Sequence, residues 1–316
     1  MKILHIVPSY KPAYHYGGPI ESVAKLCEGL CAAGHEVQVL TTTANGPTEL
    51  DIAPGTSRIV DGVNVTYFRR LTKDHTHVSP QLWKYLYRHG KEFDVIHIHS
   101  WWNFLVLVSA FICYLQGFKV VVAPRGMLSD YTLKSKNALF KKALHHFGGS
   151  QLLSKSYLHA TSEPEYEECR HLIRGWKGFV VPNILRLPDI PIVKIQNDVY
   201  TVLFLGRVDP KKGLELLFEV ISEFGQNIVL KIAGSGSQQY IAELKQQAQN
   251  LGIASKVQWL GWLSREEKFV ELMNADLYAL ISHNEKHIFK YSFYVFACDL
   301  IENNQNLINL SSKFSF

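Results

Sequence analysis

The chain has 316 residues, of which 47% are hydrophobic and 19% are charged, so it can bury a sizeable core and is long enough for two domains. A formal net charge of +5, spread over scattered basic residues, disfavours a nucleic-acid partner and favours an anionic ligand or an anionic membrane surface. The five cysteines form no Cys-x-x-Cys pair, which excludes both a disulfide framework and a zinc site from the prediction.

The first half of the chain alternates short apolar strands with helix-length segments. The opening strand, 3–7, stops at Pro8 and is too short for a signal peptide. The most apolar segment, 104–115, is too short to span a bilayer. This order is typical of an open parallel sheet with helices on both faces. The other strands are predicted at 37–41, 63–68, 95–97, 120–122 and 157–160, and the helices at 20–33, 82–89, 104–115 and 134–147.

The second half repeats this pattern after a linker. Three prolines in 182–192 indicate the break between domains. From Lys286 onward there is no Gly, no Pro and no clear period, so this segment lacks the turn chemistry of a doubly wound domain. Strands are predicted at 202–205, 228–233, 257–260 and 277–281, and helices at 214–224, 241–250 and 265–274. The predicted organisation is an N-terminal domain (1–183), a linker (184–198), a partial C-terminal domain (199–285) and an aberrant tail (286–316).

Ligands of doubly wound folds bind at the carboxyl ends of the strands, so the loops there are the candidate sites. The first such loop ends in Gly17-Gly18, just before a helix with Glu21 in its first turn. Paired glycines let backbone N–H groups approach a phosphate, and the helix N-terminus adds partial positive charge. The alternative is an ordinary loop glycine pair.

The strand that ends in His97-Ile98-His99 is followed by two tryptophans. Strand alternation places both histidines on one side, and we expect at least one to reach the mouth of the crevice. The alternative is a packed strand end. A metal site is disfavoured, because Asp94 should point to the opposite face.

Two further loops carry cations. Arg125 follows a strand and could bind a carboxylate or phosphate in bidentate fashion, or fasten its loop to the domain. Arg207 and Lys212 lie between Gly206 and Gly213, where two cations suit a diphosphate that gains charge as its sugar leaves. The alternative for this loop is a solvated basic segment.

Taken in order, these segments resemble family 4 glycosyltransferases, over residues 1–285. The second-domain loop is similar to the diphosphate-binding loop of that family. The matching segments are Gly17-Gly18 with Glu21 and Val23, Gly34-His35-Glu36-Val37, His97-x-His99, Pro124-Arg125-Gly126-Met127, Gly206-Arg207-x4-Lys212-Gly213, Ala233-Gly234-Ser235-Gly236 and Leu260-Gly261-Trp262-Leu263.

The resemblance implies a GT-B fold, with two Rossmann-like doubly wound α/β domains facing a cleft and the second incomplete. It also implies retaining transfer of a hexosyl group from a nucleotide-diphosphate sugar to an acceptor hydroxyl. Catalytic positions would be His99, Arg207, Lys212 and Glu285, and donor-binding positions would be Gly17, Gly18, Arg125, Arg207, Lys212 and Glu285. No Asp-x-Asp motif occurs, so neither a metal nor another cofactor is expected.

One departure from the family pattern is specific. Glu285 resembles the first glutamate of an E-x7-E motif, yet Phe293 occupies the position of the second, which holds the nucleotide ribose. A truncation or frameshift just after Glu285 explains this loss and the odd tail. We therefore expect little or no transfer activity.

The expected partners are the nucleotide-sugar donor and a saccharide or lipid-linked saccharide acceptor, in exopolysaccharide or glycolipid assembly, and no nucleic acid. The expected location is cytoplasmic, with peripheral contact to the inner face of the plasma membrane through a helix bearing Lys134, Lys136, Lys141 and Lys142. Those lysines could equally form a solvated helix face. Two other functions stay open: a non-catalytic binding or scaffold protein built on the first domain, and a GT-B-type nucleotide-sugar epimerase.

Overall fold

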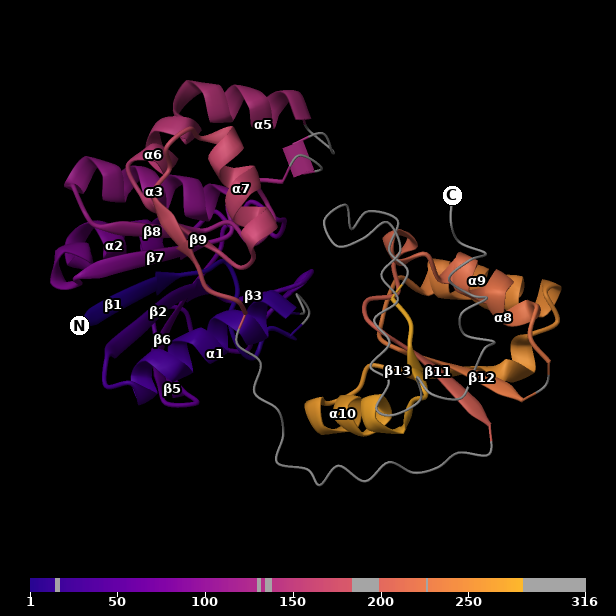
Figure 1. Ribbon diagram of the computed structural model, residues 1–316. Helices are drawn as coiled ribbons and strands as arrows, with labels where there is room; N and C mark the ends of the chain where they lie inside the picture. Colours follow the sequence, from indigo (N-terminus) through magenta and orange to yellow (C-terminus); the bar gives the residue numbers. More distant parts are fainter. Residues whose placement is uncertain (15–17, 130–131, 134–137, 184–198, 226, 281–316) are drawn as a thin grey trace. The chain divides into compact units, whose positions relative to one another are not determined.

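The computed structural model describes residues 1–14, 18–129, 132–133, 138–183, 199–225 and 227–280. The chain divides into two compact units, Met1–Arg186 and Leu187–Phe316. Each unit contains its own parallel sheet, flanked by helices (Figure 1).

The first unit is built on an eight-stranded sheet in the order β10-β9-β8-β7-β1-β2-β6-β5. Its strands run parallel except at the edge, where β5 pairs antiparallel with β6. The sequence pattern missed β5 and β10, since β5 is mostly exposed and β10 has only three residues. The strands are β1 (Lys2–Ile6), β2 (Glu36–Thr42), β5 (Ser57–Val60), β6 (Val63–Phe68), β7 (Val95–His99), β8 (Val120–Ala123), β9 (Tyr157–Ala160) and β10 (Gly178–Val180), with a small separate hairpin of β3 (Ala44–Asn45) and β4 (Thr48–Glu49).

Two hydrophobic cores lie on opposite faces of this sheet. Leu4 and Ile6 of β1 pack into one core with α2 and α3, whereas Val37 and Val39 of β2 pack into the other with α1. This division follows from strand alternation, which sends successive side chains to opposite faces. The helices of the unit are α1 (Gly18–Ala32), α2 (Pro80–His89), α3 (Phe104–Gln116), α5 (Ala138–Leu144), α6 (Ser150–Ser154) and α7 (Glu163–Leu172), with a 3-10 turn at Gly90–Glu92.

Local signals fix the ends of these helices. Asn103 caps α3 by accepting a hydrogen bond from the N–H of Val106 at 3.0 Å, and Gly117 ends it in the left-handed conformation. The helix predicted over 134–147 differs from the structure: α5 is followed by a π-helical turn, His145–Gly149. Lys134 and Lys136 fall outside the described residues.

The second unit is built on a four-stranded parallel sheet in the order β13-β12-β11-β14. Helices α8 and α9 pack together on one side, and α10 contacts β11 (Figure 1). The predicted strand over 277–281 is shorter, since β14 ends at Tyr278, and Ile281 is not among the described residues. The elements are β11 (Tyr200–Leu205), α8 (Leu214–Ser222), β12 (Ile228–Ala233), α9 (Gln238–Asn250), β13 (Val257–Gly261), α10 (Arg265–Asn274) and β14 (Leu277–Tyr278), with 3-10 turns at Pro210–Lys212 and Ala254–Lys256.

None of the helices that the structure describes combines the length and the apolar character needed to cross a bilayer.

Candidate functional site

A cluster of histidines lies at the switch point of the first sheet. Strands β2 and β6 extend the sheet to one side of β1, and the later strands β7 to β10 extend it to the other. The crevice at such a point is where doubly wound folds bind ligands. His5 of β1 pairs directly with His97 of β7, and His99 follows two residues later on the same side.

Hydrogen bonds define the tautomers of two of these rings. The Nε of Arg125 can only donate, so Nδ1 of His99 accepts, at 3.3 Å. A neutral His99 then carries its proton on Nε2 and donates it to Nδ1 of His5, 2.9 Å away. His5 therefore carries its own proton on Nε2, a buried atom with no hydrogen-bond partner among the described residues.

A second pair of rings extends the cluster across β8. Nε2 of His159 lies 3.0 Å from the carbonyl oxygen of Val181, which can only accept, so this nitrogen carries a proton. In a neutral His159 the other nitrogen, Nδ1, accepts from Nε2 of His97 at 3.2 Å. Four imidazoles from three strands thus form two hydrogen-bonded pairs in mutual ring contact.

The cluster is uncharged at neutral pH. Burial, with smaller effects from Arg125 and His159, lowers the pKa of His5 to about 3. Burial and the neighbouring rings hold the pKa values of His97 and His99 well below the ordinary range. Both predicted histidine rings are buried among the described residues, so a ligand at the crevice mouth would have to displace a neighbouring group, such as the Arg125 side chain, to touch His99.

Three of these histidines are close enough together to be candidate ligands of a metal ion. Ligand nitrogens of His5, His97 and His99 lie within 4.8 Å of one another. However, hydrogen bonds engage both nitrogens of His99, and the guanidinium of Arg125 adds a positive charge beside them. A divalent cation needs free lone pairs and tolerates a neighbouring cation poorly, so the geometry favours a hydrogen-bonded cluster over a metal centre.

Arg125 connects the cluster to two other parts of the first unit. Its Nη1 donates to Oγ of Ser22, at 2.9 Å, and to Oδ1 of Asn183, at 2.6 Å. Its backbone has a φ of 52°, an unusual value for a residue with a side chain. Of the two predicted roles, fastening the loop is the one that the contacts display.

A buried carboxylate, that of Glu165, fixes the loop after β8 that carries Arg125. Glu165, in the first turn of α7, accepts hydrogen bonds from the N–H of Gly126 at 2.6 Å and from the N–H and hydroxyl of Thr161, both at 2.7 Å. Burial lowers the pKa of Arg125, and the negative charge of Glu165 opposes that shift. Glu165 thus fixes the backbone that presents Arg125.

The loop after β1 is anchored before it reaches the predicted glycine pair. Nζ of Lys11 lies 2.7 Å from carboxylate oxygens of both Glu28, on α1, and Asp61. Burial alone would lower the pKa of Lys11, but these hydrogen bonds raise it above its ordinary value. Gly18 begins α1, whereas Gly17 lies outside the described residues.

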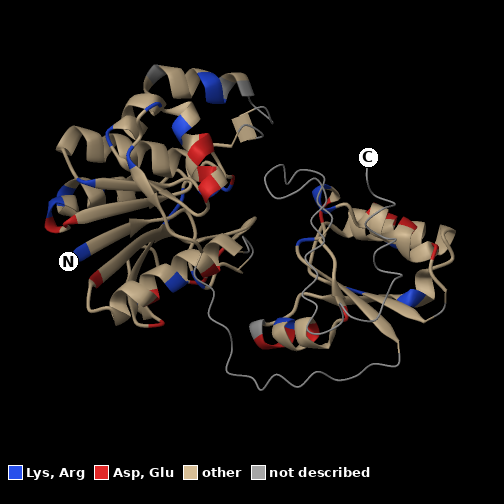
Figure 2. Ribbon diagram, viewed as in Figure 1, with Lys and Arg blue, Asp and Glu red and all other residues tan. Residues whose placement is uncertain are grey.

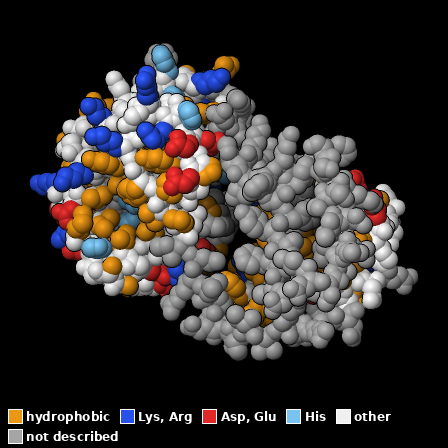
Figure 3. Space-filling model, viewed as in Figure 1, with side chains coloured by type: hydrophobic (Ala, Val, Ile, Leu, Met, Phe, Trp, Pro, Cys, Tyr) orange, Lys and Arg blue, Asp and Glu red, His pale blue; other side chains and the backbone are white. Residues whose placement is uncertain are grey.

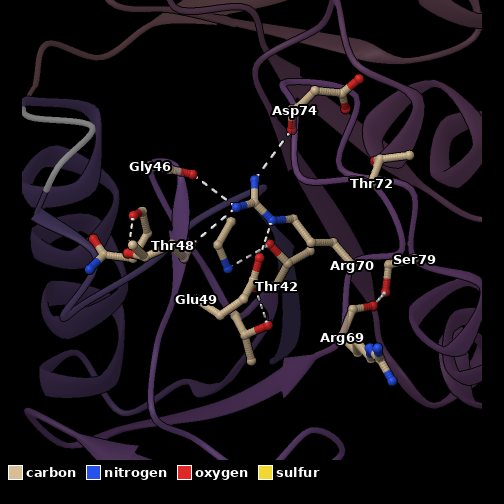
Figure 4. A network of polar contacts seen from close by, with 12 residues as sticks. Thr42, Gly46, Thr48, Glu49, Arg69, Arg70, Thr72, Asp74 and Ser79 are labelled. Carbon is tan, nitrogen blue, oxygen red and sulfur yellow. Dashed lines mark hydrogen bonds and ion pairs between the residues drawn. The ribbon is translucent and has the colours of Figure 1, made fainter.

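The loop after β2 is also held, by a buried arginine (Figure 4). Nε of Arg70 donates to Glu49 at 2.6 Å, and its terminal nitrogens donate to the carbonyl oxygens of Gly46, Thr48 and Asp74. One side chain thus ties the β3–β4 hairpin to the loop that precedes α2.

In the second unit, the predicted cationic loop follows the central strand β11. Arg207 is exposed and Lys212 half-buried. The carboxylate of Asp209 accepts from the N–H of Lys211 at 3.1 Å, and Gly213 ends the turn with a φ of 67°. The loop therefore has a defined backbone that presents two predicted donor-binding cations.

Two glycines allow the loops after β11 and β12 to lie in contact. A Cβ at Gly234 would come within 1.7 Å of the carbonyl oxygen of Gly206, and a Cβ at Gly236 within 2.0 Å of that of Val208. Close approach is reinforced by the N–H of Val208, which donates to the carbonyl of Ser235 at 2.9 Å. Glycine is therefore required at positions 234 and 236 if the two loops are to lie this close together.

Three residues of the site escaped the sequence-based prediction: His5, His159 and Glu165. His5 and His159 lie on predicted strands, so alternation could have placed them on a face, but their pairing with His97 and His99 depends on strand order. Glu165 carried no signal beyond the Ser162-x-x-Glu165 spacing of a helix start. Glu285 cannot be placed, because it lies outside the described residues.

Comparison with known proteins decides the family. The model of the glycosyl transferase 4-like domain matches residues 17–183, more than half of the chain. The chain belongs to the glycosyl transferase 4-like family. A second model, of the group 1 glycosyl transferases, matches residues 188–287.

Individual proteins similar to this glycosyl transferase 4-like chain are also glycosyltransferases or share its fold. An uncharacterized glycosyltransferase of Methanocaldococcus jannaschii is 28% identical over 290 residues, which cover 84% of this chain and 70% of that protein. Among solved structures, HepE of Anabaena in complex with UDP and glucose has a TM-score of 0.62 and 19% identity, and covers 89% of this chain and 74% of its own. Sucrose-phosphate synthase of Thermosynechococcus elongatus has a TM-score of 0.64 and 18% identity, over 89% and 75%. At such identities the structures establish the fold, which is GT-B.

Proposed function

We propose that this glycosyltransferase is of the type that transfers a hexosyl group from a nucleotide-diphosphate sugar to an acceptor hydroxyl with retention of configuration, and that Phe293 in place of the second motif glutamate leaves this chain with little or no turnover. The observation that carries the proposal is the neutral histidine cluster at the switch point of the first sheet, fastened to Arg125. The structures of HepE with UDP and with UDP-glucose support a nucleotide-sugar donor in this fold.

His99 is proposed to lie near the donor sugar. Its Nδ1 accepts the longest of the Arg125 hydrogen bonds, at 3.3 Å. A sugar hydroxyl could replace that bond and leave the guanidinium to attract a phosphate oxygen. Because the ring is neutral, its role is to orient the sugar and not to supply positive charge.

Gly17, Gly18, Arg207, Lys212 and Glu285 are proposed to contact the rest of the donor. The start of α1 offers N–H groups and a partial positive charge to the diphosphate. Arg207 and Lys212 are proposed to stabilise the departing diphosphate, which requires no metal ion in this scheme.

Titration of UDP into the full chain by calorimetry tests this assignment. Arg207→Ala and Lys212→Ala should each weaken binding by about ten-fold or more, since each removes a charge-assisted hydrogen bond. Arg58→Ala, an exposed cation on β5, is the matched control and should change nothing. Unchanged affinity in both loop variants, or affinity abolished by EDTA, would contradict the proposal.

Phe293, at the position of the second motif glutamate, motivates a second candidate. Without that ribose contact, donor binding should be weak and turnover low, which would suit a binding or scaffold protein of the same fold. Product analysis separates the candidates: a transferase releases nucleotide and glycosylates the acceptor, an epimerase interconverts the donor, and a scaffold does neither. Translation of the other reading frames past codon 285 tests the frameshift directly, because a frameshift predicts that one of them encodes the missing glutamate.

Exopolysaccharide or glycolipid assembly on the cytoplasmic side of the membrane is the proposed setting. Incubation with radiolabelled nucleotide sugars and lipid-linked acceptors tests it, and the anomeric configuration of the product, read by NMR coupling, tests retention.

A further inference from the structure

The outer side of α3 is apolar and faces solvent. The helix contains no charged residue, and its opposite side packs into the core through Leu105, Val106 and Ala110. The exposed side chains recur at intervals that place them along one side of the helix. They are Phe104 (43% exposed), Phe111 (49%), Tyr114 (45%) and Leu115 (64%).

The neighbouring helix α2 adds positive charge to this apolar side. It packs against α3 and exposes Lys84, Tyr87 and Arg88, and the 3-10 turn just beyond its end exposes Lys91 and the acidic Glu92. Helices α2, α3, α5 and α6 carry no acidic residue, and in Figure 2 the ribbons of these helices accordingly show no red. Hydrophobic side chains gather on the visible face of the first unit, and both basic and acidic side chains border them (Figure 3).

We propose that the outer sides of α2 and α3, here named the α2–α3 face, dock on an anionic lipid surface. Phe111 and Leu115 would enter the boundary between headgroups and acyl chains, while Lys84 and Arg88 would contact the headgroup phosphates. Apolar patches of this kind mark interaction sites, and the absence of acidic residues on these helices fits a negatively charged partner.

This face differs from the lysine helix expected from the sequence. Of the four lysines predicted to contact the membrane, only Lys141 and Lys142 are described, on α5. Lys141 is engaged within the fold, where its Nζ donates to the carbonyl of Thr132 at 2.8 Å. The α2–α3 face combines apolar and basic side chains. It can therefore bind a membrane both by burying apolar area and by attracting anionic headgroups.

Docking would also bring the histidine cluster near the bilayer. The N-cap of α3, Asn103, is only four residues beyond His99. A lipid-linked acceptor could then reach the site without leaving the membrane, a consequence that rests on the proposed sugar transfer. The lipid binding itself does not depend on transfer activity.

Co-sedimentation of the full chain with vesicles tests the proposal. We expect binding to phosphatidylcholine vesicles that contain phosphatidylglycerol, and much weaker binding to phosphatidylcholine alone. Removal of one cation should weaken binding about five-fold, and removal of an inserted Phe roughly ten-fold. The Arg88→Glu/Phe111→Ser double variant should therefore lose most of its binding.

The matched control is Arg58→Glu/Ile59→Ser, which changes one exposed cation and one exposed apolar residue, 71% exposed, on β5. It should bind as the unaltered chain does, and circular dichroism should show both variants folded. Absence of binding to anionic vesicles, or equal loss in both double variants, would overturn the proposal. So would light scattering showing that Arg88→Glu/Phe111→Ser converts a dimer to a monomer, since the face would then join two copies. UDP affinity should be the same in both variants, so a failure of lipid docking is separable from a failure of the proposed transfer.

Discussion

Nδ1 of His5 lies 2.9 Å from Nε2 of His99, although 94 residues separate them in the chain. The contact exists because β1 and β7 are parallel neighbours at the switch point of the sheet. It completes a series in which Arg125 fixes the tautomer of His99 and His99 fixes that of His5. His5 is therefore a positioning residue for a proposed catalytic one.

Burial of neutral histidines predicts that the free energy of unfolding decreases in acid. The unfolded chain binds protons on these rings below their ordinary pKa of 6.5, whereas the folded chain keeps His5 neutral down to about 3. Between these values the unfolded state binds more protons, so stability falls as pH falls, by about 1.4 kcal/mol per pH unit for each such histidine. Urea unfolding at several pH values between 7 and 5 should show this slope.

The His5→Leu variant isolates one ring's contribution. Its free energy of unfolding should be lower at every pH, because Nε2 of His99 loses its acceptor. The change in that free energy per pH unit should be smaller by the contribution of one histidine. His171→Ala, an exposed change on α7, is the control for stability and should leave the urea midpoint at pH 7 unaltered. An unchanged slope in His5→Leu would contradict the assignment of His5 as neutral when folded.

The alternation of apolar residues and the turn residues were enough to predict most strands. They also placed His97 and His99 on the same side of one strand, β7. They could not reveal which strands are neighbours, because pairing is a long-range property, and so the contacts of His5 with His99 and of His159 with His97 were missed. Weakly patterned elements such as β5 were missed because the exposed strand lacks an apolar stripe. The steric need for Gly234 became visible only with the backbone of Gly206 in place.

Glu165→Gln should loosen the loop that carries Arg125. The amide replaces one acceptor oxygen with an NH2 group, which would face an N–H or hydroxyl donor of Gly126 or Thr161. A buried donor left unsatisfied costs about 1–3 kcal/mol. Glu167→Gln, an exposed change on the same helix, should leave the urea midpoint unaltered. Equal midpoints for the two variants would remove Glu165 from its positioning role.

Gly234→Ala should disrupt the carboxyl edge of the second unit. The added methyl group would meet the carbonyl of Gly206 at 1.7 Å, and the φ of 149° also disfavours a side chain. The loop bearing Arg207 must therefore shift, and UDP affinity should fall by roughly ten-fold or more if one charged contact is lost. Gly225→Ala, with open space at its Cβ, is the control and should keep its affinity. Normal UDP binding by Gly234→Ala would show that the loop contact is dispensable.

Arg70→Met should destabilise the first unit although no predicted site residue is changed. The arginine side chain is 1% exposed, and its loss removes one donor to Glu49 and the donors to three carbonyl oxygens, although Thr43 still donates to the other oxygen of Glu49 at 2.7 Å. Because Glu49 is 36% exposed and can still reach water, the expected cost is about 3 kcal/mol, the lower end for a broken buried pair. Arg69→Met, at the adjacent exposed position, should cost little stability.

A double-mutant cycle with Glu49→Gln separates the contribution of the Arg70–Glu49 ion pair from that of the carbonyl hydrogen bonds. If the ion pair dominates, Arg70→Met will cost much less in the Glu49→Gln background; if the carbonyl contacts of the β3–β4 hairpin dominate, the cost will be nearly the same in both backgrounds.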